Sequence, residues 1–251
     1  MKKLPLLIGL LGLAHQQLYA MTGNDSAPIE VVKAANKIVI DGVANEKDWS
    51  KAASYPLSYI YNAIKPTDKQ ASNIKMLWDD SHVYFFFQAE DQFLTARETQ
   101  RDGFPFYDDC FEVFLMPTVS PMELHYGFEV NLNKTANDFI FLNDFYQNSF
   151  VSLKSYNPEY VVERVIEGTL NDNSDVDVGW SMELAIPIKA FHTVSQFTPL
   201  QEGSVWNLMI VRQDRNDASG ERTSTSTLLP LTEEIDVHDP KVFGQIQFIT
   251  N

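Results

Sequence analysis

An aromatic loop is the segment of this chain best suited to ligand chemistry. Phe104, Phe106 and Tyr107 lie close together, Pro105 separates the first two, and a predicted strand follows soon after. A flat aromatic ring can pack against the apolar face of a pyranose, while planar polar groups bond its hydroxyls. Loops at the end of a rigid β-fold often carry binding sites, so the loop predicts a stacking site; the alternative is that the rings only cover the fold.

Two arginines later in the chain could supply such polar groups. Arg212 and Arg215 flank Asp214 near the end of a predicted strand. The planar fork of an arginine can hold a carboxylate or sugar hydroxyls. The alternative for Arg212 is a structural ion pair with an aspartate such as Asp102 or Asp109.

Residues that enzymes use for catalysis form no recognisable pattern in this sequence. The chain has no Gly-x-Ser-x-Gly, His-Glu-x-x-His or glycine-rich phosphate-binding motif. Adjacent carboxylates such as Asp108 and Asp109 point to opposite faces of a strand, so they are poorly placed to flank one bond. Outside the N-terminal segment the histidines are scattered, at His82, His125, His192 and His238. We therefore predict a protein that is not an enzyme.

One segment has the composition of a calcium loop. Residues 171–177 read Asn-Asp-Asn-Ser-Asp-Val-Asp, which places oxygen-bearing side chains at alternate positions. The segment lacks the central glycine and the closing glutamate of an EF-hand, so a polar turn is the favoured interpretation. Other aspartates stand at predicted turns, namely Asp79, Asp80, Asp91 and Asp102. The sequence alone leaves the metal ligands unknown.

The N-terminal residues have the order of an export signal. Lys2 and Lys3 precede an apolar run over 6–13, and residues 18–20 read Leu-Tyr-Ala, a small-residue ending suited to cleavage. The prediction is an exported protein, periplasmic or extracellular, with no further membrane span. The expected organisation is a signal peptide over 1–20, a linker over 21–30 and one domain over 31–251.

The composition excludes several classes of partner. The chain has 34 acidic and 19 basic residues and a formal net charge of −15. Nucleic acids and anionic membrane surfaces bind clusters of Lys and Arg, so neither is an expected partner. Cys110 is the single cysteine, which rules out an internal disulfide and favours a small buried side chain. We expect a monomer.

Short runs rich in β-branched and aromatic residues predict an all-β fold. They are separated by Asp, Gly and Asn turns, as in a two-sheet antiparallel β-sandwich of jelly-roll type. Residues 44–53 predict one short helix, and 187–191 a further helical turn. The four tryptophans are expected in the core. The predicted strands are 38–40, 74–78, 83–89, 111–116, 126–132, 138–142, 160–166, 180–186, 205–212 and 243–249.

Several short signatures follow one another in a fixed order. Their order and spacing, over about 39–248, resemble the carbohydrate-binding module family 9-like domain. The resemblance implies an exported β-sandwich that binds a glycan without catalysis, as part of polysaccharide or oligosaccharide use. It also implies a structural calcium ion. The signatures are Ile40-Asp41-Gly42-Val43, Trp49, Trp78-Asp79-Asp80, the strand from Val83, Asp108 to Leu115, Gly179 to Pro187, Trp206 to Arg212, and Pro240 to Gly244.

The resemblance also suggests site residues. Phe106 matches a stacking aromatic that follows a proline, Glu112 a polar slot residue, and Asn131 an asparagine on the next strand. With Tyr107 as a second stacking ring and Arg212 as a donor, these are the expected carbohydrate-binding residues.

Two positions depart from the family pattern. Glu129 stands where well-understood members carry a sugar-contacting arginine, and Leu229 falls near their second stacking tryptophan. The glucose-clamping mode is therefore not transferred, and the glycan stays open.

Two other functions remain as alternatives. One is a protein-interaction domain that has kept the fold and lost the sugar slot. The other is a haem-binding electron-transfer domain of the same sandwich class, although no pattern selects an axial pair. Its candidate ligands are Met76, Met116, Met122, Met182, Met209, His125 and Lys75.

Overall fold

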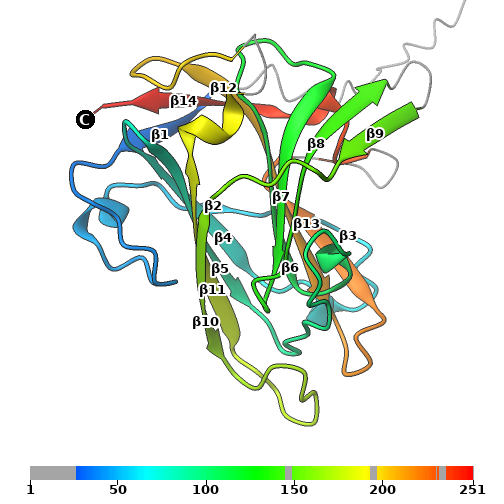
Figure 1. Cartoon of the computed structure of the whole chain (residues 1–251). Helices are drawn as coiled ribbons and strands as arrows, with labels where there is room; N and C mark the ends of the chain where they lie inside the picture. Colours follow the sequence, from blue (N-terminus) through cyan, green and yellow to red (C-terminus); the bar gives the residue numbers. More distant parts are fainter. Residues whose placement is uncertain (1–26, 145–148, 193–196, 230, 232–235, 251) are drawn as a thin grey trace, which may run out of the picture.

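The computed structural model describes residues 27–144, 149–192, 197–229, 231 and 236–250 (Figure 1). The expected signal peptide lies outside these residues. No helix in the described part of the chain is long and apolar enough to cross a membrane. The strands are β1 (Ile29–Lys33), β2 (Tyr55–Pro56), β3 (Tyr59–Tyr61), β4 (Ser72–Trp78), β5 (His82–Glu90), β6 (Cys110–Met116), β7 (Leu124–Asn131), β8 (Ala136–Asp144), β9 (Ser149–Leu153), β10 (Val161–Glu167), β11 (Gly179–Pro187), β12 (Val205–Arg215), β13 (Thr223–Thr227) and β14 (Gly244–Ile249).

The strands form one sheet that folds over into the two layers of a β-sandwich, which confirms the predicted fold class. One layer contains β10, β11, β5 and β4, and the other contains β12, β6, β7, β8 and β9. In Figure 1, β1 and β14 run across the top of the two layers. β1 is parallel to both β4 and β14, whereas the other pairs are antiparallel. No hairpin connects β1 to either neighbour, so nothing forces an antiparallel arrangement there.

Several predicted elements differ from those found. Residues 38–40 form no strand, and β1 begins at Ile29, inside the expected linker. The predicted helix over 44–53 is a single 3-10 turn, η2 (Lys47–Ser50). Its buried Asp48 accepts hydrogen bonds from Asn36 and Lys51, which ties the turn to neighbouring loops instead of extending it. The other 3-10 turns are η3 (Pro66–Asp68), η4 (Pro105–Tyr107), η5 (Ile188–Phe191) and η6 (Pro240–Val242).

The main hydrophobic core lies between the two layers. Phe87 of β5 stacks on Phe111 of β6 with ring centroids 4.5 Å apart and packs against Trp180 of β11. Burial of each such side chain contributes about 2–3 kcal/mol of transfer free energy. All four tryptophans are buried, as predicted: Trp49, Trp78, Trp180 and Trp206.

The outer face of the β12–β6–β7–β8 layer is what positions the candidate site. Side chains alternate along a strand, so Phe111 faces the core while Glu112 and Phe114 face outward. One half of this outer face is an apolar cluster around Phe114, covered by Phe243 and neighbouring residues of the C-terminal segment. The other half carries polar side chains and lies next to η4.

Candidate functional site

The aromatic loop forms a small cluster of rings on η4. The ring centroids of Phe106 and Tyr107 are 4.7 Å apart, and Phe104 packs against both. Pro105 occupies the first turn of η4, where its fixed φ suits a helical turn. Tyr107 is 62% exposed although it sits among other rings. A large ring held in solvent by its neighbours is a surface on which a ligand can stack.

A pocket of about 500 Å³ opens beside this cluster. Phe106 and Tyr107 line it together with outward-facing residues of β12, Thr223 of β13 and residues of neighbouring loops. A second hollow of about 330 Å³ shares Arg97 and Tyr107 with the first, so Tyr107 lies between two depressions. The residues of the larger pocket are Arg97, Phe106, Tyr107, Gln213, Arg215, Gly220, Glu221 and Thr223.

Arg215 connects the loop to the sheet. Its side chain is buried, and Nη2 donates to the carbonyl of Phe106 at 2.7 Å. Its backbone N–H donates to Asp109 Oδ1 at 2.6 Å, and the backbone N–H of Thr95 donates to the other carboxylate oxygen. The aromatic loop is thereby held against the end of β12.

Asn131 lies beneath the loop instead of facing the pocket. Its amide nitrogen donates to the carbonyl of Glu98 at 2.9 Å and to Asp108 Oδ2 at 2.8 Å. Its amide oxygen accepts hydrogen bonds from the backbone N–H groups of Asn133 and Thr135. All of its polar atoms are used inside the protein, so it supports the loop that carries the rings.

Glu112 and Glu129 face each other on the polar half of the outer face. Both are fully buried, and neither is among the residues that line the pocket. Burial raises the pKa of Glu112 to about 7, and burial together with the charge of Glu112 raises the pKa of Glu129 well above its usual range. Tyr61 of β3, which is paired in register with Thr225 of β13, lies near enough to Glu112 for the charge of Glu112 to add to burial in raising its pKa.

Arg212 lies on the other face of β12, inside the sandwich, and this corrects its expected place in the sugar site. It is fully buried, and Nη2 donates to the carbonyl of Glu90 at 2.8 Å. The same nitrogen is 3.3 Å from Asp91 and 3.2 Å from Asp214. Because neighbouring strand residues alternate, the outward side chains near this end of β12 are Gln213 and Arg215.

Three buried aspartates meet around Arg212. Oxygen atoms of Asp91, Asp109 and Asp214 lie within 4.8 Å of one another. Burial raises the pKa of all three, and that of Asp214 reaches about 7. The guanidinium already supplies the positive charge that a cation would bring, so this donor set does not fit a calcium ion.

Several oxygen-bearing side chains of the segment over 171–177 are hydrogen-bonded within the protein, although Asn173 Oδ1 is buried without a partner among the described residues. Asp177 accepts hydrogen bonds from the backbone N–H groups of Thr169 and Leu94, and Asn171 is bonded to both backbone groups of Ala96. Asp172 accepts from Ser174. These bonds are those of a polar turn, the interpretation that the sequence favours.

Most of the residues suggested for haem binding are buried in hydrophobic clusters. His125 Nε2 and His238 Nδ1 are 3.0 Å apart inside the apolar cluster of the outer face, where burial lowers both pKa values. Lys75 donates to the carbonyl of Trp49. Four of the methionines are buried in the hydrophobic clusters, namely Met76 and Met182 between the layers and Met116 and Met209 on the outer face.

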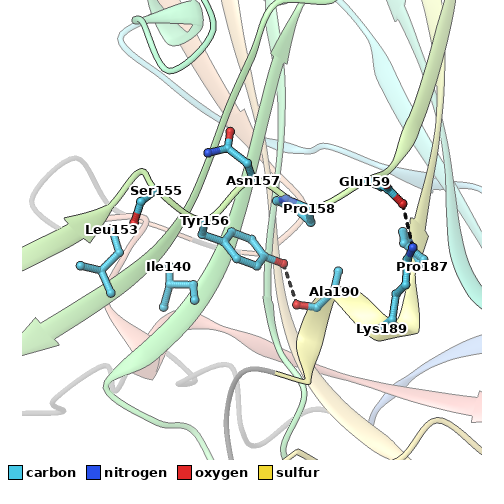
Figure 2. Close-up of a pocket in the computed structure, with 10 residues that line it drawn as sticks. All are labelled: Ile140, Leu153, Ser155, Tyr156, Asn157, Pro158, Glu159, Pro187, Lys189 and Ala190. Atoms are coloured by element: carbon cyan, nitrogen blue, oxygen red, sulfur yellow. Dashed lines mark hydrogen bonds and ion pairs between the residues drawn. The ribbon is translucent and has the colours of Figure 1, made fainter.

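A different pocket, of about 470 Å³, lies where the crossover from β9 to β10 passes η5. Figure 2 shows Tyr156 extending across it, with its hydroxyl donating to the carbonyl of Ala190 at 2.9 Å. Glu159 and Lys189 form an ion pair at the opposite end of the view. The pocket beside Tyr107 is the stronger candidate site because it offers a more exposed aromatic ring, in the aromatic loop that the sequence singles out.

Sequence reasoning missed Arg97, Gln213 and Thr223 in the pocket. A strict alternation counted from the buried Trp206 would have placed Gln213 and Arg215 outward and Arg212 inward. No comparable signal marked Arg97 or Thr223, because the loop and β13 are brought to the site by the chain topology.

Comparison with known proteins agrees with the fold. Residues 40–250 match the family described as carbohydrate family 9 binding domain-like. A search of curated proteins finds no match. A carbohydrate binding module family 9 from Caldicellulosiruptor kristjanssonii in complex with cellotriose has a TM-score of 0.61 at 17% identity, covering 90% of this chain and 95% of its own. The module from that organism in complex with glucose has a TM-score of 0.62 at 16% identity, covering 88% and 96%. The chain therefore belongs to the carbohydrate family 9 binding domain-like family.

Proposed function

We propose that this protein binds a carbohydrate, without catalysis, in the pocket beside Phe106 and Tyr107. The observation that carries the proposal is the exposed ring of Tyr107, which lines a pocket together with planar polar groups. An aromatic face with a few fixed donors is the usual composition of a sugar site. The cellotriose and glucose complexes of structurally similar modules support the same ligand class.

The proposed roles follow from the positions of the side chains. Tyr107 and Phe106 stack on the sugar ring, while Arg215 and Thr223 bond its hydroxyls. Gln213 also lines the pocket, and its amide oxygen accepts a hydrogen bond from Thr225 Oγ1 at 2.8 Å. Asn131 and Glu112 act from beneath, by supporting the loop and the polar half of the outer face. Because such shallow sites bury little surface, the affinity of one site is expected to be in the micromolar to millimolar range, roughly −8 to −4 kcal/mol.

The carboxyl groups near the site support a binding role over hydrolysis. Glycoside hydrolases place two carboxyl groups on either side of the scissile bond. Here Glu112 and Glu129 are neighbours on one sheet face, and both are too deeply buried to flank a substrate bond. The signal-like N-terminus supports export to the periplasm or beyond the cell, where a monomeric module would contribute to polysaccharide or oligosaccharide use.

The test is a glycan-array screen of the purified protein, followed by calorimetry with any glycan that binds. Tyr107→Ala should lower the affinity at least about tenfold, since loss of one stacked ring removes on the order of 1–2 kcal/mol. Phe150→Ala is the matched control, because Phe150 is also an exposed phenyl ring but lies on β9. A folded Tyr107→Ala protein with unchanged affinity would exclude this pocket as the binding site.

A further inference from the structure

We propose that the pocket beside Tyr107 takes an acidic sugar, a uronic acid, whose carboxylate is bound by Arg97 and Arg215. The inference rests on the proposed function, since it names the class of sugar for the same site. It follows from the positive charges of Arg97 and Arg215 at the pocket and from the acidic residues that lie near them.

Arg215 is a buried cation whose guanidinium has few direct hydrogen bonds. Its residue is only 5% exposed and lines the pocket. Its guanidinium donates one hydrogen bond, to the uncharged carbonyl of Phe106, and Nε has no partner among the described residues. A charged group removed from water is costly unless an opposite charge is nearby, so this guanidinium favours an anion in the pocket.

The counter-charge that Arg215 has inside the protein comes from Asp109 and then Asp108, whose charges raise its pKa. Asp109 is fully buried, and its two oxygens accept backbone hydrogen bonds from Thr95 and Arg215 at 2.6 Å each. Burial, with the charges of Asp91 and Asp214 adding to it, raises the pKa of Asp109 well above its usual range. Burial therefore works against Asp109 as a counter-charge for Arg215.

Arg97 brings a second cation to the same pocket. Its side chain is 51% exposed, Nη2 donates to the carbonyl of Gly220 at 3.0 Å, and Nε is 3.6 Å from Asp108 Oδ1. Burial lowers the pKa of Arg215, the charges of Asp109 and Asp108 raise it, and the charge of Arg97 lowers it to a smaller extent. Two guanidinium groups close enough to repel each other on one pocket make a carboxylate between them favourable.

The remaining pocket residues do not cancel this charge. Glu221 is the one acidic residue of the larger pocket, it is exposed, and no ion pair joins it to either arginine in the described part of the chain. Gln213 and Thr223 are neutral. A uronic acid combines a pyranose ring, which can stack on Tyr107, with a planar carboxylate that matches the fork of an arginine.

The experiment compares sugars that differ only at C6. Calorimetry on the purified protein would use the methyl glycosides of D-glucuronate and D-glucose, and of D-galacturonate and D-galactose. At least one uronate should bind about tenfold or more tightly than its neutral partner, as one charge-assisted hydrogen bond allows. Arg97→Gln should remove most of this preference, and Arg215→Lys should weaken it because lysine lacks the planar fork.

The control removes a cation from elsewhere on the molecule. Lys189→Gln changes the net charge equally but lies at the pocket of Figure 2, so it should leave the preference unchanged. Thermal unfolding of each variant shows whether it remains folded. If Arg215→Lys does not fold, Arg97→Gln alone tests the inference. The side chain of Arg97 is half exposed, so its replacement is expected to leave the fold intact.

The outcomes separate the inference from the function on which it rests. Equal affinity for uronate and neutral sugar, or a preference that survives Arg97→Gln, would overturn the acidic-sugar inference and leave carbohydrate binding in place. Absence of binding to these sugars and to every glycan of the array would overturn both.

Discussion

Glu112 on β6 and Glu129 on β7 are direct cross-strand neighbours, and both side chains are buried, with exposures of 2% and 4%. Asn137 of β8 donates to Glu129 Oε2 at 2.7 Å, while Glu112 Oε1 has no partner among the described residues. Burial raises the pKa of both groups, and the charge of Glu112 adds to the rise in the pKa of Glu129. A like-charge pair of this kind makes the stability of the fold depend on pH.

We expect the free energy of unfolding to fall as the pH rises from about 4.5 to 8. Below pH 4.5 Glu112 is protonated in both the folded and the unfolded chain. Between pH 4.5 and about 7, Glu112 is ionised in the unfolded chain but still protonated in the folded one. Ionisation therefore favours the unfolded chain, and the free energy of unfolding falls over this range. Glu112→Gln should reduce this fall by on the order of 2 kcal/mol, measured by urea unfolding at pH 5 and pH 8.

The control for this prediction is Glu202→Gln, which removes an exposed glutamate from a loop and should leave the pH dependence unchanged. If Glu112→Gln shows the same fall in stability as the unchanged protein, the buried pair does not cause it.

The sequence predicts the layers of the fold better than the pocket. Hydrophobic runs mark the strands that carry the core, such as β5 and β12, because burial of one strand face imposes a pattern. β13 reads Thr-Ser-Thr-Ser-Thr and leaves no such pattern, although its Thr223 lines the pocket. Arg97 reaches the pocket from a loop distant in sequence from Arg215, and only the pairing of the strands brings the two together.

Arg212 is expected to be essential for stability. Arg212→Met removes the counter-charge of Asp91 and Asp214 and leaves buried carboxyl groups together. The loss should be about 3–5 kcal/mol, and it should grow with pH as the carboxyl groups ionise. Chemical unfolding at pH 5 and pH 8 measures both effects.

The matched comparison is Lys189→Gln, which breaks the exposed ion pair with Glu159 and should cost less than about 1 kcal/mol. An Arg212→Met protein as stable as the Lys189→Gln protein would contradict a structural role for the buried ion pairs of Arg212 with Asp91 and Asp214.

Asn131 is expected to act on binding through the loop. Asn131→Ala removes the hydrogen bonds to Glu98 and Asp108, so amides over 98–109 should exchange hydrogen faster. Glycan affinity should fall several-fold, because the rings of Phe106 and Tyr107 lose their fixed position. Tyr107→Ala should lower the affinity without faster exchange in these amides, and equal exchange in both variants would argue against a positioning role.

The last prediction separates the two pockets by their tyrosines. Tyr156→Phe keeps the ring seen in Figure 2 and removes only the hydrogen bond to the carbonyl of Ala190. The free energy of unfolding should fall by about 1 kcal/mol, the usual contribution of one such bond, while glycan affinity stays the same. Tyr107→Ala should show the reverse, since the 62% exposed ring contributes little to the core but forms the stacking surface. Urea unfolding gives the free energy of unfolding of both variants, and calorimetry gives their glycan affinities. A loss of glycan affinity in Tyr156→Phe would place the binding site in the pocket between β9, β10 and η5.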